Sequence, residues 1–191
     1  MPTIKLLMTG DELLIGDIID TNSSYIAKSL FDIGIKVSEK VTIGDQQSIL
    51  VEKISQLSQS ADVLIINGGL GPTEDDLTSL ALANCMQEQL VEHTKAIAHL
   101  KSWAEKKRMA LTPSNLKQAQ LPESADIIAN AIGSAVGIYV KLNDCHVFCT
   151  PGVPSELKVM IEDEIKPKLA ELFSSHKKVH VKKYLTFGIG E

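Results

Sequence analysis

The chain has 191 residues, a length that suits one domain with a sizeable hydrophobic core. Hydrophobic residues make up 44% of it and charged residues 23%, an ordinary balance for a globular protein that argues against intrinsic disorder. The formal net charge of -5 argues against a general nucleic-acid-binding protein, because such proteins usually carry a basic patch.

The N-terminus and the cysteines favour a cytoplasmic protein that does not enter a membrane. The first residues lack the charged and long apolar segments of a signal peptide, and no run of 18 apolar residues predicts a transmembrane helix. Cys85, Cys145 and Cys149 include no C-x-x-C pair and fit free, partly buried thiols in a reducing compartment. His146 follows Cys145, but no second close pair of ligands accompanies them, so we interpret both as core residues.

The first half of the chain alternates between strand-like and helix-like segments. A short apolar run predicts a strand at residues 4–8, and apolar residues at helical spacing predict a helix at 23–32 that stops at Gly34. Further strands are expected at 37–43 and 62–67, and further helices at 46–58 and 75–86. This order predicts a parallel sheet with helices on both faces, in which ligands bind beyond the carboxyl ends of the strands.

The second half departs from this alternation. We expect one long helix over residues 88–108, where the basic residues at its end suit the helix dipole. Strands are predicted at 126–129, 138–142 and 145–149, and a tight turn at Asn143-Asp144 makes the last two an antiparallel hairpin. A helix at 156–173 follows. We therefore expect a domain over residues 1–173 and a terminal strand or connector over 174–191.

The stretch NGGLGPTEDDLTS, residues 67–79, combines a glycine-rich turn with adjacent carboxylates. Gly68, Gly69 and Gly71 allow positive φ angles and let backbone N–H groups approach an anion closely, before the start of a helix. The spacing matches neither a P-loop nor a dinucleotide-binding fingerprint. Glycine content alone therefore leaves a plain turn and an anion site about equally supported.

The carboxylates favour a metal at this turn. Thr73 and Asp76 have the T-x-x-D spacing of a helix cap, which explains one acidic residue. Glu74 and Asp75 are not explained by capping, and next to a phosphate such crowding is unfavourable without a cation. Because Mg²⁺ usually binds one or two carboxylates together with phosphate oxygens and water, we interpret the turn as a metal-bridged phosphate site.

A second acidic loop, TGDELLIGDIIDTNS, follows the first strand and carries Asp11, Glu12, Asp17 and Asp20. Any residue of the segment 20–23 could cap the helix that begins there, so capping accounts for one carboxylate and the others could complete a metal site. The turns at 133–137 and 151–154 could close the pocket. Because no G-x-S-x-G motif and no recognisably paired histidine appears, we favour metal-activated water over a covalent mechanism.

The motifs resemble a known family. TGDELLIGDIIDTNS, NGGLGPTEDDLT, NLKQAQLP, GSAVGIYV and TPGVPSE occur in the order found in the N-terminal domain of the CinA (competence/damage-inducible protein A) family. That domain is similar to the molybdopterin-binding domains of molybdenum-cofactor biosynthesis. The resemblance implies an α/β fold, a three-layer α/β/α sandwich with a mostly parallel sheet and a small antiparallel hairpin. The sequence departs from the family pattern at Ala131 and Val136, two positions at which family members commonly have proline.

The resemblance also implies an activity. Family members studied as enzymes hydrolyse the pyrophosphate of ADP-ribose with a divalent metal, so we expect a metal-dependent nucleotide pyrophosphatase that uses Mg²⁺ or Co²⁺. The alternative is a molybdopterin-binding or adenylyl-transferring module, and a third reading is a nucleotide sensor without catalysis. The expected partner is a small nucleotide or pterin, and the expected assembly is a homodimer. The C-terminal nicotinamide-mononucleotide deamidase domain of many members is expected to be absent.

Site residues follow from the motifs. Asp76 and Asp20 match the two functional aspartates of molybdopterin-binding relatives and, with Asp75, are the expected catalytic residues. The expected metal ligands are Asp75, Asp76, Asp11 and Glu12. The expected substrate-binding residues are Gly10, Asn22, Gly68, Gly69, Gly71, Thr73, Lys117, Gln118, Gly133, Ser134, Gly152 and Pro154. Of these, Lys117 and Gln118 match the KQA segment of the family and could contact phosphate.

Overall fold

A six-stranded sheet forms the centre of the computed structural model, which describes residues 2–174. Its strand order is β2-β1-β3-β8-β7-β6. The strands are β1 (Ile4–Thr9), β2 (Val37–Ile43), β3 (Val63–Asn67), β6 (Asp126–Ile128), β7 (Gly137–Leu142) and β8 (Cys145–Thr150). The four strands from β2 to β8 are parallel, whereas β7 and β6 each run antiparallel to their inner neighbour. The predicted mostly parallel sheet is confirmed.

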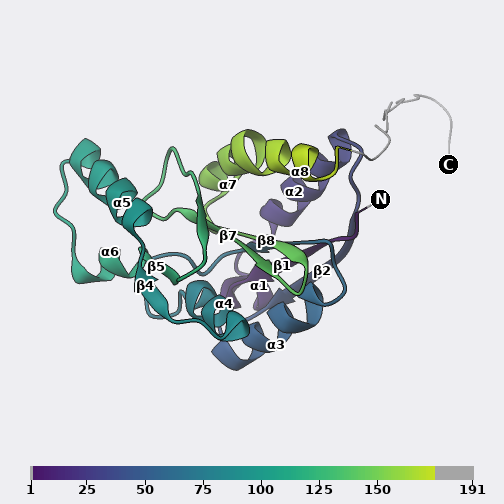
Figure 1. Cartoon of the computed structure of the whole chain (residues 1–191), viewed down its shortest axis with the longest axis horizontal. Coiled ribbons are helices and arrows are strands. Elements are labelled where there is room, and N and C mark those ends of the chain that lie inside the picture. Colours follow the sequence, from purple (N-terminus) through teal and green to yellow (C-terminus); the bar gives the residue numbers. More distant parts are fainter. Residues whose placement is uncertain (1, 175–191) are drawn as a thin grey trace, which may run out of the picture.

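Helices cover both faces of this sheet (Figure 1). One face carries α2 (Thr21–Asp32) and the C-terminal helices, and the other carries α3 (Gln47–Ser58) and α4 (Thr78–Met86). Every side chain of β3 is buried, as its continuous apolar run predicts for a central parallel strand covered on both sides. No helix within residues 2–174 is both long enough and apolar enough to cross a membrane.

The C-terminal helix predicted at 156–173 is present but interrupted. It consists of α7 (Pro154–Met160), a π-helical turn η1 (Ile161–Ile165) and α8 (Lys166–Leu172). Pro167 lies in the first turn of α8, and because proline has no N–H and crowds the preceding turn, the helix widens just before it. The strand predicted at the end of the chain falls on residues 175–191 and lies outside the described residues.

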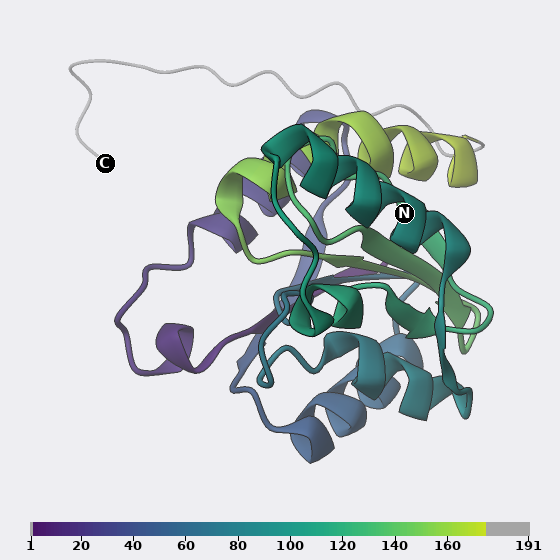
Figure 2. The ribbon, with the colours of Figure 1, turned by 90° about the vertical axis from the view of Figure 1, so that its left-hand side faces the viewer.

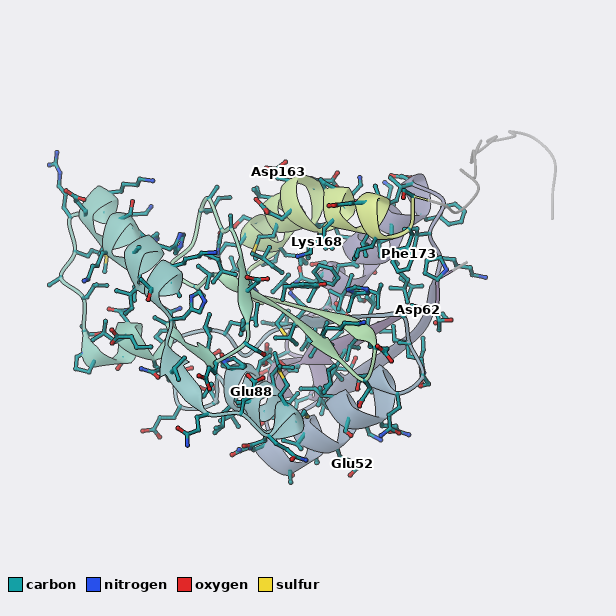
Figure 3. The ribbon with its side chains drawn as sticks, in the orientation of Figure 1. Glu52, Asp62, Glu88, Asp163, Lys168 and Phe173 are labelled. Atoms are coloured by element: carbon teal, nitrogen blue, oxygen red, sulfur yellow. The ribbon has the colours of Figure 1, made fainter. Side chains whose placement is uncertain are left out.

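Residues 88–122 form a lateral extension rather than the predicted single helix over 88–108. The extension contains β4 (Leu90–Glu92), α5 (Thr94–Lys107), α6 (Pro113–Lys117) and β5 (Gln120–Pro122), and β4 pairs antiparallel with β5 at the left of Figure 1. The helix prediction was wrong at its start because residues 90–92 bond to a strand some 30 positions later. Glu88, labelled in Figure 3, closes the base of the extension by accepting hydrogen bonds from the amide and hydroxyl of Ser124.

The predicted helix at 75–86 also begins late, at Thr78. Asp76 Oδ2 accepts hydrogen bonds from the amide of Thr73 (2.8 Å) and from its hydroxyl (2.6 Å). The carboxylate therefore closes a turn that precedes the helix, and the first residue before α4 is Leu77, without a side-chain cap. The two residues of the predicted capping pair do interact, but they stabilise the loop after the glycines instead of the helix.

The β7–β8 hairpin and the cysteines agree with the sequence predictions. Asn143 and Asp144 both have positive φ, 51° and 63°, as a tight hairpin turn requires. Cys145 and Cys149 are buried, Cys85 is half-buried, and all three thiols are free. Burial raises the pKa of Cys85 to about 11, so this thiol is unreactive at neutral pH.

His146 on β8 takes part in the packing beneath the C-terminal helix. Its Nδ1 lies 2.7 Å from the hydroxyl of Tyr139, and its ring meets Phe173 edge to face. Lys168 of α8 places its ammonium 3.4 Å from the centre of the Tyr139 ring. Lys168 and Phe173 lie above the sheet in Figure 3. These contacts fix α8 to the β7–β8 hairpin.

Candidate functional site

A pocket of about 330 Å³ opens where the parallel strands end. It is built by the segments that follow β1, β2, β3 and β8, together with residues from the turn before β7 and the start of α7. The carboxyl ends of parallel strands share one edge of a sheet, which is where α/β folds bind ligands. The segment between β1 and α2, which supplies one wall, extends away from the sheet (Figure 2).

The glycine turn after β3 is held by close contacts. Gly68 and Gly69 have φ angles of +115° and +68°, which disfavour other residues. A Cβ on Gly68 would lie 2.5 Å from Thr9 Oγ1 and 2.6 Å from the Thr9 carbonyl, and one on Gly69 would meet the hydroxyl of Thr78. Glycine is therefore needed for the turn after β3 to pack against the end of β1.

Only some backbone amides at the strand ends are available to a ligand. In the turn after β3 the Gly68 amide donates to the Thr150 carbonyl (2.9 Å), and after β1 the Gly10 amide donates to the Ile43 carbonyl (3.1 Å). Within residues 2–174, the amides of Gly69, Leu70 and Gly71 have no protein acceptor, and all three residues line the pocket. These three consecutive N–H groups are available to a ligand, and the anion site itself stays a prediction.

A buried asparagine joins two strand ends and the start of a helix beneath the pocket. Asn67 Nδ2 donates to Thr150 Oγ1 (3.1 Å) and to the Pro151 carbonyl (2.6 Å), and Asn67 Oδ1 accepts from Asn22 Nδ2 (2.9 Å). Asn22 Nδ2 also donates to the Gly152 carbonyl (2.7 Å). The start of α2, the end of β3 and the loop after β8 are thereby fixed to one another.

Five carboxylates line the pocket, and no lysine, arginine or histidine does so among the described residues. They are Glu12, Asp45, Asp75, Asp76 and Glu156. Burial, and then the charges of Asp11, Glu12 and Asp75, raise the pKa of Asp45 above its usual value. A lining rich in acceptors and negative charge favours a ligand that brings a cation or several hydrogen-bond donors.

Asp45 and Glu156 were missed by the sequence analysis. Asp45 follows β2 at the same edge of the sheet, and its Oδ2 accepts from the Asp11 amide (3.1 Å), while Asp11 Oδ1 accepts from the Asp45 amide (3.2 Å). The strand predicted at 37–43 could have identified Asp45, because ligands bind beyond the carboxyl ends of parallel strands and Asp45 lies just beyond this one. Glu156 accepts from Asn130 Nδ2 (2.8 Å) and stood inside the TPGVPSE motif, where it was read only as a helix start.

Some of the predicted site residues line the pocket and others do not. Those that line the pocket are Gly10, Glu12, Gly68, Gly69, Gly71, Asp75, Asp76, Gln118, Ser134 and Gly152. Those that do not line it are Asp11, Asp20, Asn22, Thr73, Lys117, Gly133 and Pro154. Asp20, Asn22 and Pro154 line an adjoining hollow together with Glu12. Thr73 and Lys117 lie behind the turn, where the Lys117 ammonium donates to the Thr73 carbonyl.

Asp20 acts as a helix cap. Its carboxylate accepts from the amide of Ser23 (2.9 Å) and from its hydroxyl (2.5 Å), and Lys40 Nζ lies 3.2 Å away. Burial alone would raise the pKa of Asp20, but the hydrogen bonds from Ser23 and the nearby Lys40 hold it below its usual value. Asp20 therefore stays ionised at the N-terminus of α2, where a negative charge suits the helix dipole.

The carboxylates do not form a preassembled metal centre. Within residues 2–174, no group of three or more histidine, cysteine, aspartate or glutamate side chains is arranged to hold a metal ion. The donor chemistry of the pocket still suits a hard divalent cation, because its ligands are carboxylate oxygens. A cation here would need oxygens from a bound ligand in addition to those of the protein.

Comparisons with known proteins agree with this architecture. Residues 5–171 match the family described as a probable molybdopterin-binding domain. The chain is 47% identical over 190 residues to a CinA-like protein of Colwellia psychrerythraea, covering 100% of this chain and 44% of that protein. It is 46% identical over 191 residues to a CinA-like protein of Escherichia coli strain K12 / DH10B, covering 100% of this chain and 48% of that protein. The chain thus spans less than half the length of these curated relatives.

Solved structures show the same fold. A structure of the protein CinA from Thermoplasma acidophilum, described as of unknown function, matches with a TM-score of 0.79 and 29% identity, covering 87% of this chain and 97% of that chain. The molybdopterin biosynthesis enzyme MoaB from Thermus thermophilus matches with a TM-score of 0.61 and 15% identity, covering 92% and 96% of the two chains, a likeness of fold alone. The chain therefore belongs to the molybdopterin-binding domain family, in the form found in CinA-like proteins.

Proposed function

We propose that this domain binds a small phosphorylated heterocycle, of the pterin or nucleotide class, at the edge where β1, β3 and β8 end. The observation that carries the proposal is the run of free amides at Gly69, Leu70 and Gly71, which line a pocket otherwise walled by carboxylates. Three adjacent N–H donors suit phosphate oxygens. The family description, and the similarity in fold to a molybdopterin biosynthesis enzyme, favour a pterin as the heterocycle.

A divalent cation is part of the proposal. Phosphate brought next to Glu12, Asp45 and Asp75 would meet like charge, and burial together with the charges of neighbouring carboxylates already raises the pKa of Asp45. Mg²⁺ or Co²⁺ would neutralise this charge and be held by one or two of these carboxylates and the phosphate oxygens. The chain supplies the carboxylates on one side of the phosphate and the turn amides on the other.

A second candidate is hydrolysis of a dinucleotide pyrophosphate such as ADP-ribose. The number of carboxylates favours it, because a divalent cation bound to phosphate usually needs only one or two of the five that line the pocket. A divalent cation, when bound, lowers the pKa of a water molecule and offsets charge on the phosphate. In this reaction the turn amides orient the diphosphate. Asp76 lines the pocket and is held by two hydrogen bonds from Thr73.

Two measurements test these functions. The fluorescence of a 6-alkylpterin monophosphate, titrated with protein in the presence and absence of Mg²⁺, is expected to report saturable binding that Mg²⁺ strengthens. Release of AMP from ADP-ribose with Mg²⁺ or Co²⁺ reports hydrolysis. If neither the pterin nor ADP-ribose binds with any of these metals, the proposal is wrong.

Asp76 provides the corresponding variant. For hydrolysis we expect Asp76→Ala to abolish AMP release, and substantial remaining turnover would exclude the assigned role. Asp17→Ala is the matched control, because Asp17 is an exposed aspartate that does not line the pocket. The homodimer implied by the resemblance and the cytoplasmic location stay predictions, which size-exclusion chromatography with light scattering and cell fractionation would test.

A further inference from the structure

A groove outside the candidate site lies between α5 and the loop that connects β6 to β7. It has a volume of about 590 Å³ and is lined by residues of α5 and by residues 129–133. His99 Nε2 lies 3.0 Å from the Gly133 carbonyl, and this contact joins the two walls. The buried Asn130 holds the loop wall, because its Oδ1 accepts from the amides of Ile132 (3.1 Å) and Gly133 (2.9 Å). The groove is therefore built into the fold.

The helix wall of the groove is cationic and aromatic. His99, Trp103 and Lys106 follow one another at spacings of four and three residues, which places them on one face of α5. Lys107 also lines the groove, and no aspartate or glutamate among the described residues does so. Neither lysine forms an ion pair with any residue that the structure describes. Cations at the end of a helix suit its dipole, but the dipole does not explain why an indole and the exposed Ile132 line the same groove.

The loop after β1, residues 11–19, exposes a group of aliphatic side chains. Four of its large apolar residues are 56–83% exposed, namely Leu14, Ile15, Ile18 and Ile19. The loop consists of α1 (Asp11–Leu14) and the turn after it, and Figure 2 shows it projecting from the edge of the sheet. The Ile18 amide donates to the Glu12 carbonyl (3.2 Å), which gives the loop a defined shape. Single exposed aliphatic residues are ordinary, but a group of this kind marks an interaction site.

The loop and the groove are complementary in charge and in polarity. Residues 11–20 contain four carboxylates and no lysine, arginine or histidine. The groove presents two ammonium groups and an imidazole together with an indole and an aliphatic side chain. Apolar contact surrounded by opposite charges is the usual composition of a protein interface, and tryptophan is among the residues that contribute most to binding there. The carboxylates argue against a lipid surface as the partner of the loop, because anionic lipids repel them.

A second copy of the chain carries both surfaces. The loop contributes no residue to the lining of the groove in its own chain, and in Figure 2 it projects at the left while α5 crosses the upper part of the view. Two chains can therefore each place their loop in the groove of the other. Such a reciprocal contact is the isologous arrangement of a dimer with two-fold symmetry.

We propose that two copies of this chain associate by inserting the 11–19 loop of each into the groove between α5 and residues 129–133 of the other. The aliphatic side chains of the loop cover Trp103 and Ile132, and its carboxylates face the lysines of the groove. This inference names the faces that meet, which the expectation of a homodimer leaves open. It does not depend on which ligand the domain binds.

Trp103 makes the groove directly observable, because it is the single tryptophan of the chain. The full chain is diluted through the micromolar range while its mass is followed by light scattering and the emission of Trp103 by fluorescence. We expect a dimer at high concentration, and we expect Trp103 emission to move to shorter wavelength as the dimer forms. Association should weaken in high salt, because salt screens the opposite charges of the two surfaces.

A loop variant tests the inserted surface. Ile15 is 71% exposed and lines no part of the groove, so Ile15→Lys removes an apolar contact with the partner and adds a charge that the groove repels. Phe31→Lys is the matched control, because Phe31 is an exposed apolar residue of α2 outside both surfaces. We expect Ile15→Lys to weaken dimerisation at least tenfold and Phe31→Lys to change it less than twofold.

A groove variant tests the receiving surface. Lys106→Glu combined with Lys107→Glu reverses the charge of the groove, and we expect it also to weaken dimerisation at least tenfold. Lys95→Glu combined with Lys101→Glu is the matched control, because both residues are exposed on α5 and neither lines the groove. Circular dichroism of each variant is expected to match that of the wild type, since all the replaced side chains are exposed.

The outcomes are separate from those of the proposed function. If the wild type stays monomeric at the highest concentration, the loop and the groove do not join two copies and the inference is wrong. It is equally wrong if the chain dimerises but either test variant dimerises as tightly as its control, or if Trp103 emission does not change with the mass. Failure of the wild type to bind a pterin or ADP-ribose would contradict the proposed function and leave this inference unaffected.

Discussion

Replacing Asn67 by alanine tests whether the asparagine network holds the pocket edge together. Asn67 is 3% exposed and makes the three hydrogen bonds that join Thr150, Pro151 and Asn22 to the end of β3. At about 1 kcal/mol net for each, their loss lowers the free energy of unfolding by about 3 kcal/mol. For a domain of this size, 1 kcal/mol shifts the melting temperature by roughly 2–4 °C, so the expected fall is roughly 6–12 °C.

The assay is urea unfolding followed by far-ultraviolet circular dichroism, with the slope m compared between proteins. An unchanged m with a lower midpoint would report a change of stability alone. Asn84→Ala is the matched control, because Asn84 is exposed on α4 and alanine is the better helix former there. If Asn67→Ala and Asn84→Ala unfold at the same urea concentration as the wild type, the network does not hold the strand ends and the reasoning fails.

Three further predictions concern other parts of the site. Gly68→Ala places a Cβ within 2.6 Å of the β1 backbone at positive φ and should lower the free energy of unfolding by about 2 kcal/mol or more, as followed by thermal melts. Gly16→Ala, also at positive φ but in open space, should lower it less. Equal losses in the two variants would contradict the contact between Gly68 and β1. Asp45→Asn should raise the melting temperature at pH 7. The pKa of Asp45 is raised by folding, so its ionised form opposes folding above that pKa and the gain should fade as the pH falls through the carboxyl range; a gain independent of pH would refute this. Thr112→Ala removes the capping box of α6, worth about 1 kcal/mol, and should speed amide hydrogen exchange there about fivefold, whereas unchanged exchange would show that the cap is not needed.

The sequence predicted those elements whose stability is decided locally. The all-apolar run of β3 predicted a buried strand, and β3 is one. The helical spacing of Leu50, Ile54 and Leu57 predicted a helix with one buried face, and α3 buries all three. The three-residue strand β4 is different, because it exists only through pairing with β5, and nothing in residues 88–92 alone distinguishes it from the start of a helix. Its prediction therefore needed contacts that are distant in sequence.

The candidate site shows the same division. Thr73 and Asp76 have the correct spacing for a cap and do bond to each other, but the glycine turn before them places that bond in a loop, so a valid local pattern predicted the wrong element. The glycines and carboxylates after β1 and β3 were predicted as site residues because each motif directly follows an apolar run that predicts a strand. Gln118 was selected by resemblance alone, and its place in the pocket wall and its buried oxygen without a partner among the described residues depend on packing that the sequence does not display.

The lateral extension has a consequence for how such domains diversify. It leaves and returns through β4 and β5, where Glu92 pairs with Gln120, so its two ends stand side by side and Glu88 and Ser124 close its base. A segment with adjacent ends tolerates changes at its exposed parts, whereas Ala96 and Ala119 belong to the main hydrophobic core and constrain any replacement. Because the returning end carries Gln118 into the wall of the pocket and Lys117 into that of a smaller one beside it, substitutions in this extension can alter the ligand site while the six-stranded sheet keeps its pairing.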